Sequence, residues 1–503
     1  DTVAVVADPE VTRAKAAEIA DILAPALDVP VLDLEQRLSK KDRRFVYLAR
    51  HVMPDVWEAT KARLKKAGVS AVWAEADPLR TYPASTLASN IVGFVGSEGH
   101  GLGGLEHSLD DQLSGRDGWA RYERAKGRQI PLGKWARQDP VPGADVRLTI
   151  DRDVQWTAQR AITEQVRRTK AESGSAIVLD SKTGELLAVA TAPGFDPRKP
   201  GSASPADRGN RPLQEVYEPG SVVKVLTAAA LLDAGYVSPE TKITVPGSLR
   251  IDGERISDHW DHDTIRLTFA GAIAESSNVG TVLAARKLPM EEHYAYLKKF
   301  GLGAPTGIGF PGETKGLLQP GSKWSELTRA TISFGQGLSV NAVQMASALG
   351  VIANDGVRRA PVLVDGTIDE DGKVTRTPRP KPTRVVSKQA AAELTAMMEA
   401  VTGPEGVAQS AAIPGYRVAG KTGTAQRFDP ACGCYNGYSA SFGGFAPADD
   451  SRYVVYVVLH DPQGDHSGSG VAAPVFREIM SFVLQKYGVP PSETPAPKAR
   501  LTW

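Results

Sequence analysis

The residues best suited to chemistry are Ser221 and Lys224, which form the only Ser-x-x-Lys in the sequence. Pro219 and Gly220 end any preceding helix, so Ser221 is expected to open an apolar helix over 222–234. The spacing places Lys224 one turn along on nearly the same face, within reach of the serine hydroxyl. Burial disfavours a charged amine, so Lys224 is a candidate general base for a Ser221 nucleophile. An isolated Ser-x-x-Lys is more often a capping serine with a snorkelling lysine, so its context decides.

Two further motifs supply that context, Ser276-Ser277-Asn278 and Lys421-Thr422-Gly423-Thr424. The three motifs in this chain order are typical of serine β-lactamases and penicillin-binding proteins. Acyl transfer from a D-Ala-D-Ala peptide needs a nucleophile, a base, a proton donor for the leaving amine and groups that hold a terminal carboxylate. The motifs offer a candidate for each of these roles.

The catalytic roles divide among the motif side chains. Ser276 is expected to relay a proton to the departing D-alanine. Asn278 is expected to bind the substrate amide and to steady Lys224. Lys421 is expected to supply positive potential at the site.

The third motif also offers groups that bind substrate. The hydroxyls of Thr422 and Thr424 can hold the carboxylate, and Gly423 would let the substrate lie along the strand edge. The backbone N–H groups of Ser221 and Thr424 are the expected oxyanion hole.

The same short patterns recur where ordinary structure explains them. Lys182-Thr183-Gly184 lies at the turn of a predicted hairpin, where Thr-Gly is common turn chemistry. Ser339-Val340-Asn341 precedes a predicted helix at 342–353, where Ser and Asn are common caps. Single tripeptides are therefore weak signals, and the ordered set of three motifs is the strong one.

Longer segments carry a resemblance to a known family, at 217–233, 274–282, 333–356 and 419–426. The region from about 150 to 490 resembles the transpeptidase domain of class B, monofunctional penicillin-binding proteins, and residues 90–118 resemble the pedestal of that family. The central motif reads Ser-Ser-Asn where Ser-Asp-Asn is also common, but Ser276 and Asn278 are retained. The resemblance implies an α+β fold with an antiparallel five-stranded sheet covered by helices.

Three regions are expected along the chain. Residues 1–150 should form a non-catalytic, dimerisation-like pedestal, because apolar periodicity lapses into Gly, Pro and charged residues over 127–143. Residues 151–490 should form the transpeptidase domain. The Pro-rich residues 491–503 are expected to be a disordered tail.

Composition excludes several classes of function. The chain has 503 residues and a formal net charge of +1, so it has no electrostatic signature of nucleic-acid binding. Its longest aliphatic and aromatic run, Tyr453–Leu459, is far shorter than the roughly 20 residues of a membrane-spanning helix.

Three other patterns suggest metal, dinucleotide or disulfide chemistry. His259–Asp263 could present metal ligands but is better explained as a polar loop, and 99–104 matches G-x-G-x-x-G without a surrounding βαβ series. We therefore expect no metal and no cofactor. Cys432 and Cys434 are either two free thiols or, in an oxidising extracytoplasmic location, a local disulfide.

The resemblance implies a peptidoglycan D,D-transpeptidase that is acylated by β-lactams. The implied partners are stem peptides and a membrane glycosyltransferase. The implied location is the extracytoplasmic face of the bacterial cytoplasmic membrane, with an anchoring helix outside this chain. A β-lactam sensor and a D,D-carboxypeptidase remain alternatives, because both keep the same motifs. The sequence leaves open a role in division, elongation or sporulation.

Overall fold

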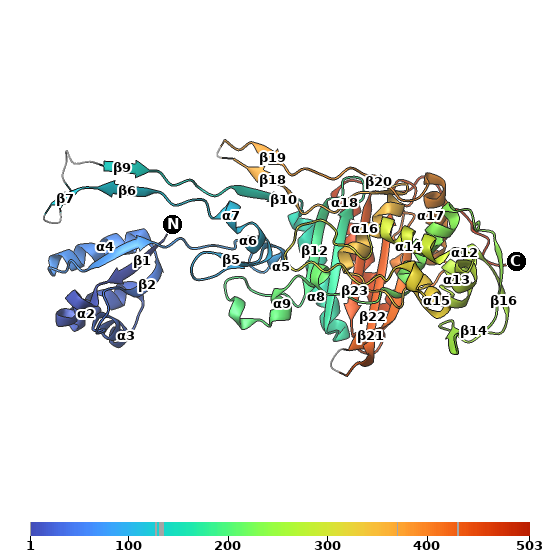
Figure 1. Cartoon of the computed structure of the whole chain (residues 1–503), viewed down its shortest axis with the longest axis horizontal. Helices are drawn as coiled ribbons and strands as arrows, with labels where there is room; N and C mark the ends of the chain where they lie inside the picture. The colour runs from blue at the N-terminus through green and yellow to red at the C-terminus, as the bar shows by residue number, and fades with distance from the viewer. Residues whose placement is uncertain (1, 126–127, 130–134, 370, 430–431) are drawn as a thin grey trace. The chain divides into compact units, whose positions relative to one another are not determined.

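A computed structural model describes residues 2–125, 128–129, 135–369, 371–429 and 432–503. The chain divides into two compact units (Figure 1). Unit 1 comprises residues 1–83 and 95–100, and Unit 2 comprises 84–94 and 101–503. None of the helices in the described ranges combines the length and the apolar composition of a membrane span.

Unit 1 is built on a three-stranded antiparallel sheet in the order β2-β1-β3. Its elements are β1 (Val3–Ala7), α1 (Pro9–Thr12), α2 (Ala16–Leu27), α3 (Val31–Leu38), β2 (Val46–Val52), α4 (Pro54–Lys66) and β3 (Val72–Ala76). Lys15 leaves helical dihedral angles at φ −127° and ψ 25°, so α2 begins only at Ala16.

The described residues of 84–94 and 101–150 belong to the same compact unit as the transpeptidase region, whereas the sequence predicted a domain boundary near 150. Ile91 and Leu105 are buried in the main hydrophobic core of Unit 2. Asn90 Nδ2 donates hydrogen bonds to the backbone oxygens of Asp207 and Gly209, both at 2.6 Å. These contacts are long-range, so composition along the chain did not reveal them.

Unit 2 contains the expected antiparallel five-stranded sheet, in the order β12-β11-β23-β22-β21. Its strands are β11 (Ser173–Asp180), β12 (Leu186–Ala192), β21 (Ala419–Asp429), β22 (Cys434–Ala446) and β23 (Tyr453–His460). Every residue of β11 and β23 is buried, as expected for inner strands covered on both faces. The predicted hairpin is confirmed by the antiparallel pairing of β11 with β12.

Helices cover both faces of this sheet (Figure 1). On one face α8 (Arg152–Thr169) and α18 (Ala473–Lys486) share a core with the sheet. On the other face lie α11 (Lys224–Asp233), α16 (Ala342–Ala353) and α17 (Lys388–Thr402). The nine residues of α11 from Lys224 to Leu232 are all buried, which confirms the predicted central helix.

The tail predicted to be disordered makes defined contacts. Leu501 O accepts a hydrogen bond from Thr268 N at 3.0 Å, and Arg500 O accepts one from Thr268 Oγ1 at 2.5 Å. Lys242 Nζ lies 4.8 Å from the centre of the Trp503 ring. The prediction was wrong because Pro-rich composition reports the lack of a local core and not the acceptors available elsewhere in the fold.

Shorter elements complete the description. The helices are α5 (Ser89–Val92), α6 (Gly104–Ser108), α7 (Asp110–Leu113), α9 (Pro205–Arg208), α10 (Arg211–Gln214), α12 (Phe269–Ala274), α13 (Asn278–Ala285), α14 (Met290–Phe300) and α15 (Glu326–Ser333). The strands are β4 (Phe94–Val95), β5 (Gly101–Gly103), β6 (Trp119–Tyr122), β7 (Arg124–Ala125), β8 (Arg128–Gln129), β9 (Trp135–Gln138), β10 (Asp145–Leu148), β13 (Lys242–Val245), β14 (Ser248–Ile251), β15 (Glu254–Ser257), β16 (Ile265–Thr268), β17 (Val357–Arg358), β18 (Val364–Ile368), β19 (Val374–Arg376) and β20 (Thr383–Arg384).

Candidate active site

Ser221 lies in a tight turn beside edge strand β21. A 3-10 turn spans Gly220–Val223 and α11 begins at Lys224, so Ser221 precedes the α-helix and does not open it as predicted. Gly220 has a φ of +58°, and a Cβ atom there would lie 3.0 Å from Thr424 O. Glycine therefore allows both the left-handed backbone and the close approach of the serine turn to β21.

Lys224 is fully buried, and its amine contacts the backbone and side chain of Ser276. Lys224 Nζ donates to Ser276 O at 2.5 Å and to Ser276 Oγ at 3.3 Å. Burial, and then the charge of Lys421, hold the pKa of Lys224 well below its ordinary value, while Asp258 opposes this shift. This environment favours the neutral amine that a general base requires.

Ser276 occupies a sharp turn between α12 and α13 with a φ of +58°. Ser277 caps α13, because its Oγ accepts a hydrogen bond from Gly280 N at 2.8 Å. Asn278 Nδ2 donates to Ser257 O at 3.0 Å. The hydrogen bonds that steady Lys224 therefore come from Ser276, where the sequence had suggested Asn278.

Lys421 reaches the same serine from β21. Lys421 Nζ donates to Ser276 Oγ at 2.8 Å and lies 3.3 Å from Thr422 Oγ1. Burial lowers the pKa of Lys421 to about 7. The structure thus brings two amines from distant parts of the chain to one hydroxyl.

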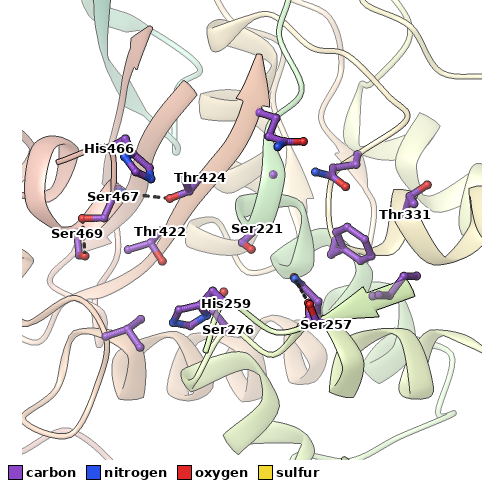
Figure 2. A pocket seen from close by; sticks show the side chains of 18 of the residues that line it. Ser221, Ser257, His259, Ser276, Thr331, Thr422, Thr424, His466, Ser467 and Ser469 are labelled. Carbon is purple, nitrogen blue, oxygen red and sulfur yellow. Dashed lines mark hydrogen bonds between the residues drawn. The ribbon is translucent and has the colours of Figure 1, made fainter. Parts of the chain in front are cut away.

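Ser221 lines a cavity of about 930 Å³, and Ser276, Asn278, Thr422 and Thr424 line it as well. Figure 2 shows the labelled motif residues directed into it, namely Ser221, Ser276, Thr422 and Thr424. The nucleophile candidate, the proton-relay candidate and the carboxylate-binding candidates therefore share one open space. This arrangement suits acyl transfer on an extended peptide.

Two family profiles match almost the whole chain. The profile described as penicillin binding protein transpeptidase domain matches residues 174–481, and the one described as penicillin-binding protein dimerisation domain matches residues 2–148. The chain belongs to the class B penicillin-binding proteins. Like the relatives of this family that carry the name, it is a peptidoglycan D,D-transpeptidase.

Named relatives agree with this class B assignment. PbpB of Mycolicibacterium smegmatis is 42% identical over 92% of this chain and 72% of its own length. Peptidoglycan D,D-transpeptidase FtsI of Escherichia coli is 34% identical over 97% of this chain and 81% of its own length. The crystal structure of penicillin binding protein 3 from Mycobacterium tuberculosis has a TM-score of 0.75 and 39% identity, and it covers 84% of this chain and 93% of its own.

In this class B protein, Gly423 serves packing within the domain. A Cβ atom at Gly423 would lie 2.3 Å from Ser441 Oγ and 2.9 Å from both Pro219 O and Val222 Cγ2. The missing side chain therefore lets β21 pack on β22 and on the serine turn. The sequence had suggested that glycine is needed here so that substrate can approach, whereas these contacts show that it is needed for packing.

Several residues of the site carried no recognised sequence signal. His259 and His466 line the cavity, and burial followed by the charges of Lys224 and Lys421 lowers the pKa of His259. Gly468 N donates to Thr424 Oγ1 at 3.4 Å. The polar loop containing His259 had been noted, but its sequence distance from each motif hid its place in the site.

Cys432 and Cys434 form a disulfide in the hairpin that joins β21 to β22. This is the bonded alternative of the two that the sequence left open. The hairpin continues the strand that bears Lys421, Thr422 and Thr424, so the disulfide lies at the far end of that strand.

The second Lys-Thr-Gly and the second Ser-x-Asn have structural roles. Lys182 and Thr183 lie in the turn of the β11–β12 hairpin, and Asn341 caps α16 in a capping box with Gln344. Over the described ranges, no group of three or more His, Cys, Asp or Glu side chains could hold a metal ion.

Proposed function

We propose that Ser221 is the nucleophile with which this D,D-transpeptidase cross-links peptidoglycan stem peptides. The observation that carries the proposal is the convergence of Lys224 and Lys421 on Ser276 Oγ, in the wall of the cavity that Ser221 lines. An amine kept neutral by burial can accept a proton, and a neighbouring hydroxyl can pass one on. The chain therefore holds the groups that both halves of acyl transfer require.

In the first half-reaction Ser221 Oγ attacks the carbonyl carbon of the penultimate D-alanine, and its proton passes to Lys224 Nζ. The peptide C–N bond then breaks, and the terminal D-alanine leaves with a proton delivered by Ser276 Oγ, which takes a proton back from Lys224 Nζ. Ser276 suits this relay because its hydroxyl lies 3.3 Å from Lys224 Nζ and 2.8 Å from Lys421 Nζ. The product is an ester between Ser221 and the donor peptide.

Thr422, Thr424 and Lys421 are proposed to hold the terminal carboxylate of the donor. With its pKa lowered to about 7, Lys421 can be neutral in the empty site, and an arriving carboxylate would favour its charged form. The N–H groups of Ser221 and Thr424 are proposed as the oxyanion hole. The close approach of Gly220 to Thr424 O supports this pairing of the serine turn with β21.

In the second half-reaction the amine of an acceptor peptide attacks the ester carbonyl. A new amide bond forms and the ester C–O bond to Ser221 breaks. The proton lost by the amine passes through Lys224 Nζ to Ser221 Oγ and restores its hydroxyl. A carboxypeptidase would use water in this step, and a sensor would stop at the acyl-enzyme. Residues that line the cavity lie on both sides of Ser221 (Figure 2). This arrangement favours a transpeptidase, which must bind a donor and an acceptor peptide.

β-Lactams are proposed to acylate the same oxygen, because their strained amide presents the carbonyl to Ser221. The similar penicillin binding protein 3 from Mycobacterium tuberculosis has been solved complexed with ampicillin, at a TM-score of 0.76 and 38% identity. Ampicillin is therefore a suitable covalent probe of this site.

Intact-protein mass spectrometry with ampicillin tests the assignment. Ser221→Ala should give no adduct, and Lys224→Ala should slow acylation by several powers of ten, the scale observed when a nucleophile loses its base. Lys182→Ala changes the second Lys-Thr-Gly, in the β11–β12 turn, so this variant should be acylated at the normal rate. An adduct in folded Ser221→Ala, or one that maps to another peptide, would overturn the assignment.

A second assay separates the transpeptidase from its alternatives. A peptide ending in D-Ala-D-Ala is incubated with an amine acceptor, and the products are separated by mass. Cross-linked product supports the proposal, whereas hydrolysed tetrapeptide alone indicates a carboxypeptidase and a stable acyl-enzyme without product indicates a sensor.

We also propose action at the extracytoplasmic face of the cytoplasmic membrane, alongside a membrane glycosyltransferase. The cross-linking substrate and the Cys432–Cys434 disulfide both suit an oxidising compartment outside the cytoplasm. Chemical cross-linking of a tagged full-length protein to its neighbours in growing cells tests the proposed partner. Recovery of the tagged protein without any glycosyltransferase would contradict the proposal.

A further inference from the structure

The turn that carries Ser276 and Asn278 is held by a carboxylate from outside the motif. Asp258 follows β15, and its side chain has no exposed surface. Asp258 Oδ2 accepts a hydrogen bond from Ser277 Oγ at 2.7 Å, and Oδ1 accepts one from Val279 N at 3.0 Å. One carboxylate therefore binds the residues on both sides of Asn278.

His262 completes this arrangement from the same segment. Its Nε2 lies 3.0 Å from Asp258 Oδ2, and its Nδ1 lies 2.5 Å from Asp263 O. Both ring nitrogens thus face oxygen acceptors, an arrangement that only the doubly protonated imidazolium satisfies. Burial lowers the pKa of His262, but the hydrogen bonds to Asp263 O and Asp258 outweigh burial and raise it overall.

The same carboxylate faces the buried amines of the site. Lys224 interacts electrostatically with Lys421 from β21, which disfavours its charge, and with Asp258, which favours it. His259 also faces both lysines and Asp258. Asp258 is therefore a negative charge among cationic groups, and His262 is in direct contact with it.

We propose that Asp258, clamped by His262, is a positioning residue for acyl transfer that holds the Ser276–Asn278 turn and sets the charge that Lys224 experiences. The inference deepens the proposed function, because it rests on the roles assigned to Ser276 and Lys224. Neither residue touches the reacting atoms. Their effect passes through the turn and through the electrostatic field around the two lysines.

Asp258→Asn and Asp258→Ala separate these two effects. Asn retains an oxygen for Val279 N but removes the charge, so less stabilisation remains for charged Lys224 and the acid limb of the acylation profile should move about one pH unit lower. Ala removes the charge and also releases the turn, so its acid limb should move in the same direction and its maximal acylation rate should fall by roughly a hundredfold, the scale of a misplaced catalytic group. Asp261→Asn is the matched control, since it removes an exposed carboxylate of the same segment and should change neither property.

The readout is the rate of ampicillin adduct formation by intact mass between pH 5 and pH 10, on protein shown to be folded by its melting curve. A merely structural role would reduce the rate without moving the pH profile. An Asp258→Asn profile that coincides with wild type would overturn the inference.

Imidazole NMR provides a reading that does not depend on acylation. His262 should titrate above the ordinary histidine pKa in the wild type, and its pKa should fall in Asp258→Asn. His262→Gln identifies the signal by its loss. An unchanged His262 titration in Asp258→Asn would contradict the pairing, whereas failure of Ser221 acylation in wild type would contradict only the proposed nucleophile.

Discussion

Ser276 Oγ receives hydrogen bonds from two buried amines, Lys421 Nζ at 2.8 Å and Lys224 Nζ at 3.3 Å. Burial disfavours the charged form of both amines, and the charge of Lys421 adds to this effect at Lys224, so both pKa values are lowered. A hydroxyl between two such amines can accept a proton from one side and donate one on the other. Burying two lysine amines costs folding free energy. The lowered pKa values that result suit the site to proton transfer.

Replacing Lys421 with Met should make stability less dependent on pH. Between pH 7 and the ordinary lysine pKa of about 10.4, the unfolded chain holds a proton that folded Lys421 releases, so wild-type stability rises with pH in this window. Lys421→Met has no such proton. The melting temperature of Lys421→Met minus that of the wild type should therefore be higher at pH 7 than at pH 9.

Thermal melts of both proteins across this range check the prediction, with Lys182→Met, a half-buried lysine outside the site, as the control. A constant difference in melting temperature would contradict the depressed pKa. Acylation by ampicillin should also be lost in Lys421→Met.

At the scale of elements, α12 connects the end of the chain to the catalytic turn. Thr268 caps α12, because its Oγ1 accepts a hydrogen bond from Gly271 N at 3.0 Å. A Cβ atom at Gly271 would lie 1.9 Å from Leu501 O, so the tail packs directly on this helix. The other end of α12 leads through Glu275 into Ser276.

Deleting residues 500–503 should slow acylation without preventing folding. The deletion removes the two backbone acceptors of Thr268 and loosens α12, so Ser276 should be less well positioned. We expect a loss of roughly tenfold in the ampicillin acylation rate, below the hundredfold scale of a direct misplacement. Lys498→Ala, an exposed residue of the same segment, is the control. A wild-type rate in the deletion variant would show that the tail does not position α12.

The disulfide should affect the β21–β22 hairpin and hardly change global stability. It joins residues two apart in the chain, and closing so short a loop removes little unfolded-state entropy, about 2 kcal/mol or less. Replacing Cys432 and Cys434 with Ser should therefore shift the melting temperature only slightly. Thiol titration of denatured, unreduced protein should find no free thiol, and two reactive thiols per chain would reject the bond.

At the scale of the whole molecule, the division into compact units differs from the division into family domains. The dimerisation profile ends at residue 148, but residues 84–94 and 101–150 pack with the transpeptidase region. The cause is the burial of Ile91 and Leu105 in the larger core. Apolar residues contribute stability where they are buried, whichever family segment they belong to.

A shortened chain that begins at residue 84 should be more stable than one that begins at residue 151. The longer form keeps the buried Ile91 and Leu105 side chains, each worth about 1.5–3 kcal/mol, and the Asn90 hydrogen bonds. Both forms should be acylated by ampicillin, because every motif lies in Unit 2. Cooperative melts compare their stability, and equal melting temperatures would contradict the role given to residues 84–150.

Much of the fold followed from local chemistry. Turn chemistry at Lys182–Gly184 predicted the β11–β12 hairpin, and the apolar stretch after Ser221 predicted the central helix α11. The cap at Asn341 and the turn at Lys182 were recognised because capping and turn formation involve neighbouring residues. The sequence by itself thus determined these local elements, and motif order determined the family.

Only the tertiary structure decided how the site is held together and charged. Asp258 contacts Ser277 from 19 positions away, and Lys421 contacts Ser276 from 145 positions away. No periodicity reports such a contact, because it depends on how separate elements pack. The depressed pKa values of Lys224 and Lys421 likewise arise from burial, which exists only once the sheet and its helices have closed around them.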